Sequence, residues 1–544
     1  MNLQKKTKYM IIVFVMLLSC FIGFKSLNPS KPNYTDNTKT NVNNQMEHIK
    51  NIAQEPHSIF DIDAKEKVRD YLVSELSELG IESKLYKYDD LYEKRSDSLV
   101  SVENIYAEIK GKSDSYILLA THYDSSHAKT ERYAEIDGSL GAADAGYALA
   151  TILETLRVIK EQNIELENGI KILFTDGEEY GLLGAKEAVK ESEILDGVNY
   201  VINIEARGTE GPAVMFETSP NNDAVLDLYK SSTSPFSYSI TPEIYRLLPN
   251  WTDFTVFLEN NLTGINIAVL DGLENYHTPY DNPENLSEES MQHYGDQVLP
   301  IVTEFVTNEK YSNAENFKGK NDSIFFVLGN QFIEYSKTLN FIFLISILVL
   351  IAYLYKKFNI KSIKNIFKFV LINTLFTVIA MSIGYIVSRI VAILNGREFK
   401  LTYLPLIKFE GVIFITILIG VFIAFILTIK KFTRSLDEKN EFILGSLVLL
   451  LILSIIFTIV LPGASYLTVI PSILLSLFIA IKEIFKNIKS MWFIILIPLA
   501  LIIILYVPMV YLFNCALTFG ALAANIFFVM IAYISILTGI KSIN

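Results

Sequence analysis

Histidine and carboxylate side chains recur in the first half of the chain, most of them directly after a short apolar segment. In chain order they are His122, Asp124, Asp144, Glu178, Glu179, Glu205 and His277. Imidazole nitrogens and carboxylate oxygens are ligands that suit zinc. Several carboxylates packed together without cations would repel one another, whereas two dications would balance their charge. Two metals about 3.5–4 Å apart can hold the attacking and leaving oxygens of a hydrolysis, so the residue types predict a two-metal site.

The apolar segments before these residues have the pattern of buried β-strands. They cover Ile81–Tyr88, Val102–Ile109, Tyr116–Ala120, Gly169–Phe174, Val198–Ile204 and Gly264–Leu270. Helical patterns lie among them over Ala64–Leu79, Ala143–Glu161, Gly184–Glu191 and Glu288–Val306. Strands that alternate with helices predict an α/β fold with a mostly parallel central sheet flanked by helices. Ligands bind outside the carboxyl ends of such strands, so the histidines and carboxylates are expected to share one cleft.

Five motifs occur in the order found in the M28 zinc peptidases. They are His122-Tyr123-Asp124, Gly141-Ala142-Ala143-Asp144, Glu178-Glu179, Asn203-Ile204-Glu205 and Tyr276-His277. The chain therefore resembles this family, which includes aminopeptidases and glutamate carboxypeptidases. The closer resemblance is to its membrane-embedded members, namely vacuolar membrane proteases, endoplasmic reticulum metallopeptidases and related bacterial proteins. The motif match covers about Pro56 to Asp281, and the later part resembles these members only in layout.

The resemblance implies a zinc aminopeptidase-like fold and a ligand set for two zinc ions. His122, Asp144 and Glu205 would hold one ion, and Asp144, Glu179 and His277 the other, with Asp144 as the bridge. Soluble aminopeptidases usually have Asp where Glu205 stands, whereas membrane members also use Glu. Ala145-Gly146-Tyr147 replaces the Asp or Asn, then Ser-Gly, that the family usually has after the bridging Asp. This departure keeps Asp144 as a ligand, but the loop that follows it can differ in conformation from that of the family.

The resemblance also implies three catalytic roles. Glu178 would be the general base, taking a proton from metal-bound water and passing it to the leaving amine, with a pKa raised toward neutrality. Asp124 would orient His122 through a hydrogen bond. Tyr276 would help to polarise the scissile carbonyl. Asp253 could support the site or cap a helix, and Arg207 and Arg246 could bind a substrate carboxylate or pair with acids. The other four histidines, His48, His57, His127 and His293, are expected to lie at the surface or to support the ligands without binding metal.

Composition divides the chain into a globular part and a membrane part. It is 51% hydrophobic with a mean hydropathy of +0.33, and the apolar residues concentrate in the last third. We expect a membrane anchor or a cleaved signal or lipoprotein segment at 1–27, a linker at 28–45 and the peptidase domain at 46–310. A second linker at 311–338 and a membrane domain of about seven helices at 339–544 follow. The net charge of −12 argues against a nucleic-acid partner, and two cysteines allow no disulfide framework.

Basic residues predict the orientation in the membrane. Lysines precede the first apolar run, and Lys or Arg clusters fall on every second loop of the later spans, around residues 356–368, 430–434, 482–489 and 541. The positive-inside rule then places the peptidase domain outside the cytoplasm. Richness in Lys, Ile and Asn with few cysteines favours a bacterial plasma membrane. An endoplasmic reticulum or vacuolar membrane with a lumenal domain is the alternative, in which five N-x-S/T sequons would be glycosylated.

These expectations combine into a membrane-anchored two-zinc metallopeptidase that acts on peptides and contacts the lipid bilayer. An aminopeptidase is the leading expectation. The alternatives are a catalytically inactive receptor or scaffold on an M28 fold, and a glutaminyl cyclase-like acyl transferase. The sequence leaves open which end of a peptide is recognised, whether manganese or cobalt replaces zinc, and the oligomeric state.

Overall fold

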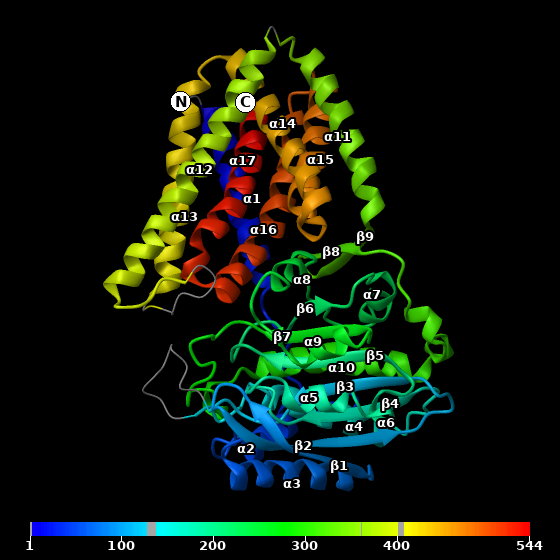
Figure 1. Ribbon diagram of the computed structural model, residues 1–544. Helices are drawn as coiled ribbons and strands as arrows, with labels where there is room; N and C mark the ends of the chain where they lie inside the picture. Colours follow the sequence, from blue (N-terminus) through cyan, green and yellow to red (C-terminus); the bar gives the residue numbers. More distant parts are fainter. Residues whose placement is uncertain (1–2, 128–137, 361, 401–406, 408, 544) are drawn as a thin grey trace. The chain divides into compact units, whose positions relative to one another are not determined.

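A computed structural model describes residues 3–127, 138–360, 362–400, 407 and 409–543 (Figure 1). The chain forms two compact units. One unit is Asn28–Ser323, and the other combines Met1–Leu27 with Ile324–Asn544. The residues of the expected metal site all fall in the first unit, which is called the sheet unit below; the second is called the helical unit.

The sheet unit contains a seven-stranded sheet with the order β1-β2-β4-β3-β5-β7-β6. The strands are β1 Ser83–Glu93, β2 Ser98–Ile109, β3 Tyr116–His122, β4 Gly169–Thr175, β5 Val198–Ala206, β6 Val214–Thr218 and β7 Gly264–Val269. The central strands β4, β3, β5 and β7 run parallel, whereas β2, β1 and β6 pair antiparallel at the edges. The predicted α/β class with a mostly parallel centre is confirmed. β6 is an additional strand that the sequence analysis did not predict.

Helices cover both faces of this sheet. They are α2 Val42–Ile52, α3 Ile62–Glu78, α4 Gly146–Glu161, α5 Leu183–Ala188, α6 Ser192–Leu195, α7 Asp223–Tyr229, α8 Ile240–Tyr245, α9 Asp253–Glu259 and α10 Glu288–Thr307. Leu118 and Ala120 of β3 pack in one core cluster with residues of α5, α6 and α9. Ile117 and Leu119 are equally buried, and side chains alternate along a strand, so the opposite face is covered too. α4 and α10, which also contact β3, provide that cover.

The segment 28–45, expected as a flexible linker, is instead part of the sheet unit. Thr40 and Gln45 are fully buried, and α2 begins at Val42. The Asn41 side chain accepts a hydrogen bond from the Asn43 N–H, and the Asn41 N–H donates to buried Glu154 over 2.8 Å. Asn and Thr are common in disordered segments, but the same side chains also form helix caps, which is the use made of them here.

The segment 311–338, also expected as a linker, contains short regular elements. They are the 3₁₀ turns η2 Glu309–Ser312 and η3 Ala314–Phe317 and the hairpin strands β8 Ser323–Leu328 and β9 Gln331–Ser336. Tyr311 and Phe317 are buried and pack with Phe305 at ring-centroid distances of 5.8 Å. These aromatic side chains tie the first half of the segment to the sheet unit, because burying two large rings outweighs the polar composition around them.

In the described part of the chain, eight helices are long and apolar enough to cross a membrane. They are α1 Leu3–Lys25, α11 Lys337–Lys357, α12 Ile363–Leu394, α13 Glu410–Phe432, α14 Leu436–Val460, α15 Tyr466–Ile484, α16 Leu496–Leu517 with the turn η5 Met491–Ile495 before it, and α17 Leu522–Ile543, which the turn η6 Phe519–Ala521 precedes. The amino-terminal helix α1 packs on α16, where Phe24 meets Tyr511 edge-on at 6.5 Å. The Lys8 ammonium donates to the Ile543 carbonyl over 2.6 Å, at the carboxyl end of α17.

Buried His293 on α10 should make the stability of the sheet unit depend on pH. Its Nδ1 accepts from the Ala213 N–H over 2.9 Å, and its Nε2 lies 3.1 Å from the Ser234 carbonyl, to which it donates. Burial lowers the pKa of His293 to about 4. A histidine whose pKa falls on folding contributes stability above its unfolded value of about 6.5, and this contribution is lost as the pH falls through 4.

The free energy of local opening should fall between pH 7 and 4 in the wild type, because His293 gains a proton when it is exposed. We predict that this fall is about 2–3 kcal/mol smaller in His293→Gln, which keeps an acceptor and a donor but does not titrate. Hydrogen exchange of β6 and β7 peptides in the full chain measures this. Comparing the two proteins at the same pH removes the intrinsic pH dependence of exchange. An equal loss of protection in both proteins would contradict the assignment.

Candidate metal centre

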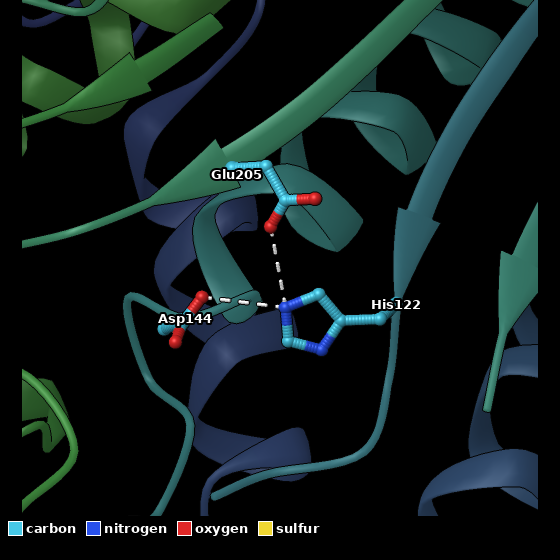
Figure 2. A group of neighbouring side chains, drawn as sticks. All are labelled: His122, Asp144 and Glu205. Carbon is cyan, nitrogen blue, oxygen red and sulfur yellow. Dashed lines mark hydrogen bonds and ion pairs between the residues drawn. The ribbon is translucent and has the colours of Figure 1, made fainter. Parts of the chain in front are cut away.

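The first candidate ligand group joins the ends of two parallel strands to a loop. His122 ends β3, Glu205 lies near the end of β5, and Asp144 lies just before α4. Figure 2 shows both carboxylates directed at the same nitrogen of the imidazole ring. His122 Nε2 lies 3.3 Å from Asp144 Oδ1 and 3.4 Å from Glu205 Oε2. All three residues are at most 5% exposed, so a charge placed among them would be held in a largely dry environment.

The second group uses the other oxygen of Asp144. His277 Nε2 lies 3.2 Å from Asp144 Oδ2 and 2.8 Å from Glu179 Oε1. In each group the candidate ligand atoms lie within 4.8 Å of one another. One carboxylate therefore faces both histidines, with one oxygen toward each. The structure brings together all five residues that the sequence analysis proposed as metal ligands.

Each group fits a divalent cation by the chemistry of its donors. His122 Nδ1 donates to the Asp124 carbonyl over 2.9 Å, which leaves Nε2 as a lone-pair donor in the neutral ring. Glu179 Oε1 is buried without a hydrogen-bond partner, although His277 Nε2 lies 2.8 Å away. One imidazole nitrogen and two carboxylate oxygens in each group form a donor set that suits zinc.

The pKa shifts show an excess of negative charge in the same place. Burial, followed by the charge of Glu205, raises the pKa of Glu178 well above its usual value. Burial opposes protonation of His277, but Glu179 and Asp144 raise its pKa to about 10. Burial also favours the protonated form of Asp144, yet hydrogen bonds to His122 and His277 hold its pKa below the usual range. In the protein alone, protons on the histidines balance the carboxylates, a role that metal cations would take over.

Residues 104–302 match the sequence profile described as peptidase family M28. The chain carries a peptidase family M28 domain. It is 26% identical to mouse "Endoplasmic reticulum metallopeptidase 1" over 264 residues, which are 47% of this chain and 28% of that protein. It is 30% identical to the Schizosaccharomyces pombe "Putative endoplasmic reticulum metallopeptidase 1" over 210 residues, which are 38% of this chain and 25% of that protein.

A match of 28% identity over 381 residues to the "Vacuolar membrane protease" of Candida tropicalis covers 65% of this chain and 40% of that protein. The chain thus spans only a quarter to two fifths of these relatives. The chain is a membrane protein, since its described residues include eight helices that are long and apolar enough to cross a bilayer. A Zn-dependent exopeptidase structure from Parabacteroides distasonis has a TM-score of 0.39 at 20% identity, with 48% of this chain and 98% of that chain covered. An aminopeptidase structure from Aneurinibacillus has a TM-score of 0.41 at 12% identity, with 51% and 97% covered.

Asp124 contacts both His122 and the loop that follows β4. Its backbone carbonyl lies 2.9 Å from His122 Nδ1 and accepts the ring proton, whereas its carboxylate lies 3.6 Å from the same nitrogen. The carboxylate accepts from the backbone N–H of Glu178 over 3.0 Å and from that of Glu179 over 3.4 Å. Asp124 therefore fixes the loop that carries the general-base candidate as well as the first histidine.

Tyr276 lies against the second histidine. Its ring stacks on the His277 ring with centroids 3.7 Å apart and planes 24° apart. Burial, followed by the charge of Asp144, raises the pKa of the Tyr276 phenol well above its usual value. The phenol thus keeps its proton at neutral pH and can act as a hydrogen-bond donor in the site.

Asp281 is a positioning residue that the sequence analysis named only as the end of the motif match. One of its oxygens accepts from the Ala143 N–H over 2.6 Å, and the other lies 3.3 Å from the Asp144 N–H and 3.2 Å from the Ser139 hydroxyl. It therefore holds the backbone of the bridging residue. The sequence shows that Asp281 follows His277 by four residues. This spacing alone does not show that its side chain reaches the loop before α4.

Asp253 supports the same site from the start of α9. Its carboxylate accepts from the Thr175 hydroxyl, and burial, followed by the charge of Glu205, raises its pKa to about 7. The N-cap of α9 is Thr252, which forms a capping box with Thr255. Thr252 therefore caps the helix, and Asp253 supports the site.

The remaining histidines lie outside both ligand groups. His48 contacts Tyr71 through Nδ1, at 2.8 Å from the phenol oxygen. His57 is buried beside the site, and its Nδ1 lies 2.9 Å from the Glu55 carbonyl. His127 lies 3.6 Å from Asp61 at a more exposed position, and His293 belongs to the core. None of the four joins a ligand group among the described residues, as the sequence analysis expected.

We predict that Asp281→Asn weakens metal binding at both groups by about tenfold to a hundredfold, which is typical when a supporting hydrogen bond to a ligand is lost. An amide can offer only one oxygen to the two backbone N–H groups. Metal content after equilibration with graded chelator, measured by mass spectrometry of the full chain, tests this. Glu284→Gln is the matched charge control, and equal metal retention in both variants would contradict the role.

Proposed function

We propose that this chain is a membrane-anchored two-zinc metallopeptidase that releases amino-terminal residues from peptides. The observation that carries the proposal is the shared carboxylate of Asp144, which presents one oxygen to the His122 group and the other to the His277 group. A single structural metal would need only one such group. Two groups joined by a bridging carboxylate suit the hydrolysis of an amide bond.

His122, Asp144 and Glu205 would hold one zinc ion, and Asp144, Glu179 and His277 the other. When bound, the ions would polarise the attacking water and the scissile carbonyl. Glu178 would receive the proton of that water at its carboxylate and deliver it to the leaving amine. Its half-buried position and raised pKa suit a group that first accepts and then releases a proton near neutral pH. The Asp124 carboxylate accepts a hydrogen bond from the Glu178 N–H and so constrains the loop that carries Glu178.

Tyr276 would donate its phenolic proton to the oxygen that becomes negative in the transition state. Its stacking on His277 restricts the ring to one orientation beside the second ligand group. A donor fixed in advance stabilises a developing charge without reorganisation during the reaction.

The surroundings of the two ligand groups support an aminopeptidase rather than a carboxypeptidase. The pKa values of Glu178, Glu217 and Asp253 are raised by burial and also by the charge of Glu205, so these acidic groups repel one another near the ligands. A free substrate ammonium would relieve this repulsion, whereas a free carboxylate would add to it. The substrate class we infer is therefore a peptide with an unblocked amino terminus.

We predict that Glu178→Gln lowers kcat by at least a thousandfold while two metal equivalents remain bound, because Glu178 belongs to neither ligand group. The full chain is purified in detergent, its metal is counted by mass spectrometry, and its activity is measured with leucyl-coumarin and a free tripeptide. Glu259→Gln, on the exposed surface of α9, is the matched control and should resemble the wild type.

Product masses distinguish the alternatives in the same experiment. Hydrolysis of the tripeptide gains one water, whereas cyclisation of an amino-terminal glutamine loses ammonia. A wild type that binds two zinc ions and cleaves no peptide would favour the inactive scaffold. A wild type that binds no metal would contradict the hydrolase proposal.

We also propose that the M28 domain lies outside the cytoplasm of a bacterial plasma membrane. The positive-inside rule and the basic clusters of the chain support this orientation. We predict that, in intact bacterial cells, a membrane-impermeant maleimide labels Glu259→Cys but not Lys431→Cys, both in a Cys20→Ser, Cys515→Ser background. After lysis both positions should react. The opposite labelling in intact cells would contradict the orientation.

A further inference from the structure

Glu217 on β6 is a buried acidic side chain that forms no ion pair with any of the described residues. It is 5% exposed, and its Oε2 accepts one hydrogen bond from the Asn266 amide over 3.3 Å. Burial raises the pKa of Glu217, whereas the Asn266 hydrogen bond and the charge of the exposed Arg246 side chain act in the opposite direction. A buried carboxylate without a cation is costly, so packing alone gives no reason for a glutamate here.

A row of amides links Glu217 to the metal centre. The register pairs Asn203 of β5 with Asn266 of β7, and Asn266 with Glu217 of β6. Asn203 Nδ2 donates to Glu205 Oε1 over 2.9 Å and lies 3.1 Å from Asn266 Oδ1. A register shift at Phe216 brings Glu217 opposite Asn266, as β-bulges near functional sites commonly do. Glu217 therefore lies on the same face of the sheet as Glu205, two strands further along.

The strand spacing limits which substrate group can reach Glu217. Two strand-to-strand steps separate β6 from β5 by about 10 Å. The α-ammonium of a substrate lies only about 2.5 Å from the scissile carbonyl carbon, so it stays beside the ligand groups. A lysine or arginine side chain extends roughly 6 Å or more from its Cα, which suits a charged group placed to one side of the metal centre.

An aromatic side chain, Tyr245, lies near both Glu217 and the ligand groups. Tyr245 is half-buried and meets Phe216 edge-on with ring centroids 4.9 Å apart. Burial, then the charges of Glu217, Glu205 and Glu178, raise the pKa of its phenol, so the ring lies within electrostatic reach of all three carboxylates. Such a ring can pack against the alkyl stem of a long basic side chain whose charge continues to a carboxylate.

We propose that Glu217 is a specificity-determining residue that binds the side-chain cation of an amino-terminal lysine or arginine. This inference rests on the proposed aminopeptidase function and names its substrate class. The cation would be withdrawn from water and paired with a carboxylate that forms no ion pair with the other described residues. A charge-assisted pair in such a place discriminates strongly against a side chain of equal length that lacks the charge.

The test compares lysyl-coumarin with norleucyl-coumarin, whose side chain has the same stem without the ammonium. We expect the full chain in detergent to favour the lysyl substrate by at least tenfold in kcat/KM. Glu217→Gln keeps an acceptor for Asn266 and should lower the lysyl-to-norleucyl ratio at least tenfold. Glu259→Gln removes an equivalent charge from the exposed surface and should leave the ratio unchanged.

A second measurement needs no variant and remains valid if Glu217→Gln fails to fold. Lysinamide should inhibit the wild type at a concentration at least tenfold lower than norleucinamide. A wild-type preference for norleucine, equal inhibition by the two amides, or an unchanged ratio in Glu217→Gln would overturn the assignment while the peptidase stands. If the wild type cleaves neither substrate, the aminopeptidase proposal itself fails, and this inference fails with it.

Discussion

The concentration of buried negative charge around Asp144 is the constraint on which the site depends. Its two oxygens lie 3.3 and 3.2 Å from the Nε2 atoms of His122 and His277. Each imidazole also lies close to a glutamate, so carboxylates outnumber the histidines. Burying such a group is unfavourable unless cations balance it. The loop before α4 must therefore be held firmly, and Asp281 does this through two backbone N–H groups.

The parallel centre of the sheet explains how residues far apart in sequence reach one place. His122 and Glu205 end neighbouring parallel strands, and Glu178 and Glu179 follow the strand on the other side of β3. A single side chain can then serve two of these strand ends, as Asp124 does with its carbonyl on His122 and its carboxylate on the Glu178 loop. The amide row from Asn203 to Glu217 extends the polar face of the sheet from the ligand groups to the buried carboxylate that we assign to substrate selection.

The sequence was sufficient to predict the central strands and all five candidate ligands, because continuous apolar runs and the residues that follow them are local signals. β6 was missed because Val214–Thr218 is short and its pattern is interrupted by the register shift at Phe216. The partners of Asp124 and Asp281 were beyond reach, since they are backbone groups of distant loops. The row to Glu217 requires the strand order β5-β7-β6, which no local pattern encodes. The segment 28–45 was wrongly predicted to be a flexible linker, because helix caps and disordered segments use the same residue types.

The most direct test of the central claim is X-ray absorption at the zinc edge on the full chain loaded with two zinc equivalents. If Asp144 bridges two ions, the spectrum should contain a metal scatterer at about 3.5–4 Å from the absorbing zinc. Asp144→Asn should abolish that scatterer while histidine scattering from residual zinc remains. A wild-type spectrum with nitrogen and oxygen neighbours but no metal neighbour would contradict the shared centre.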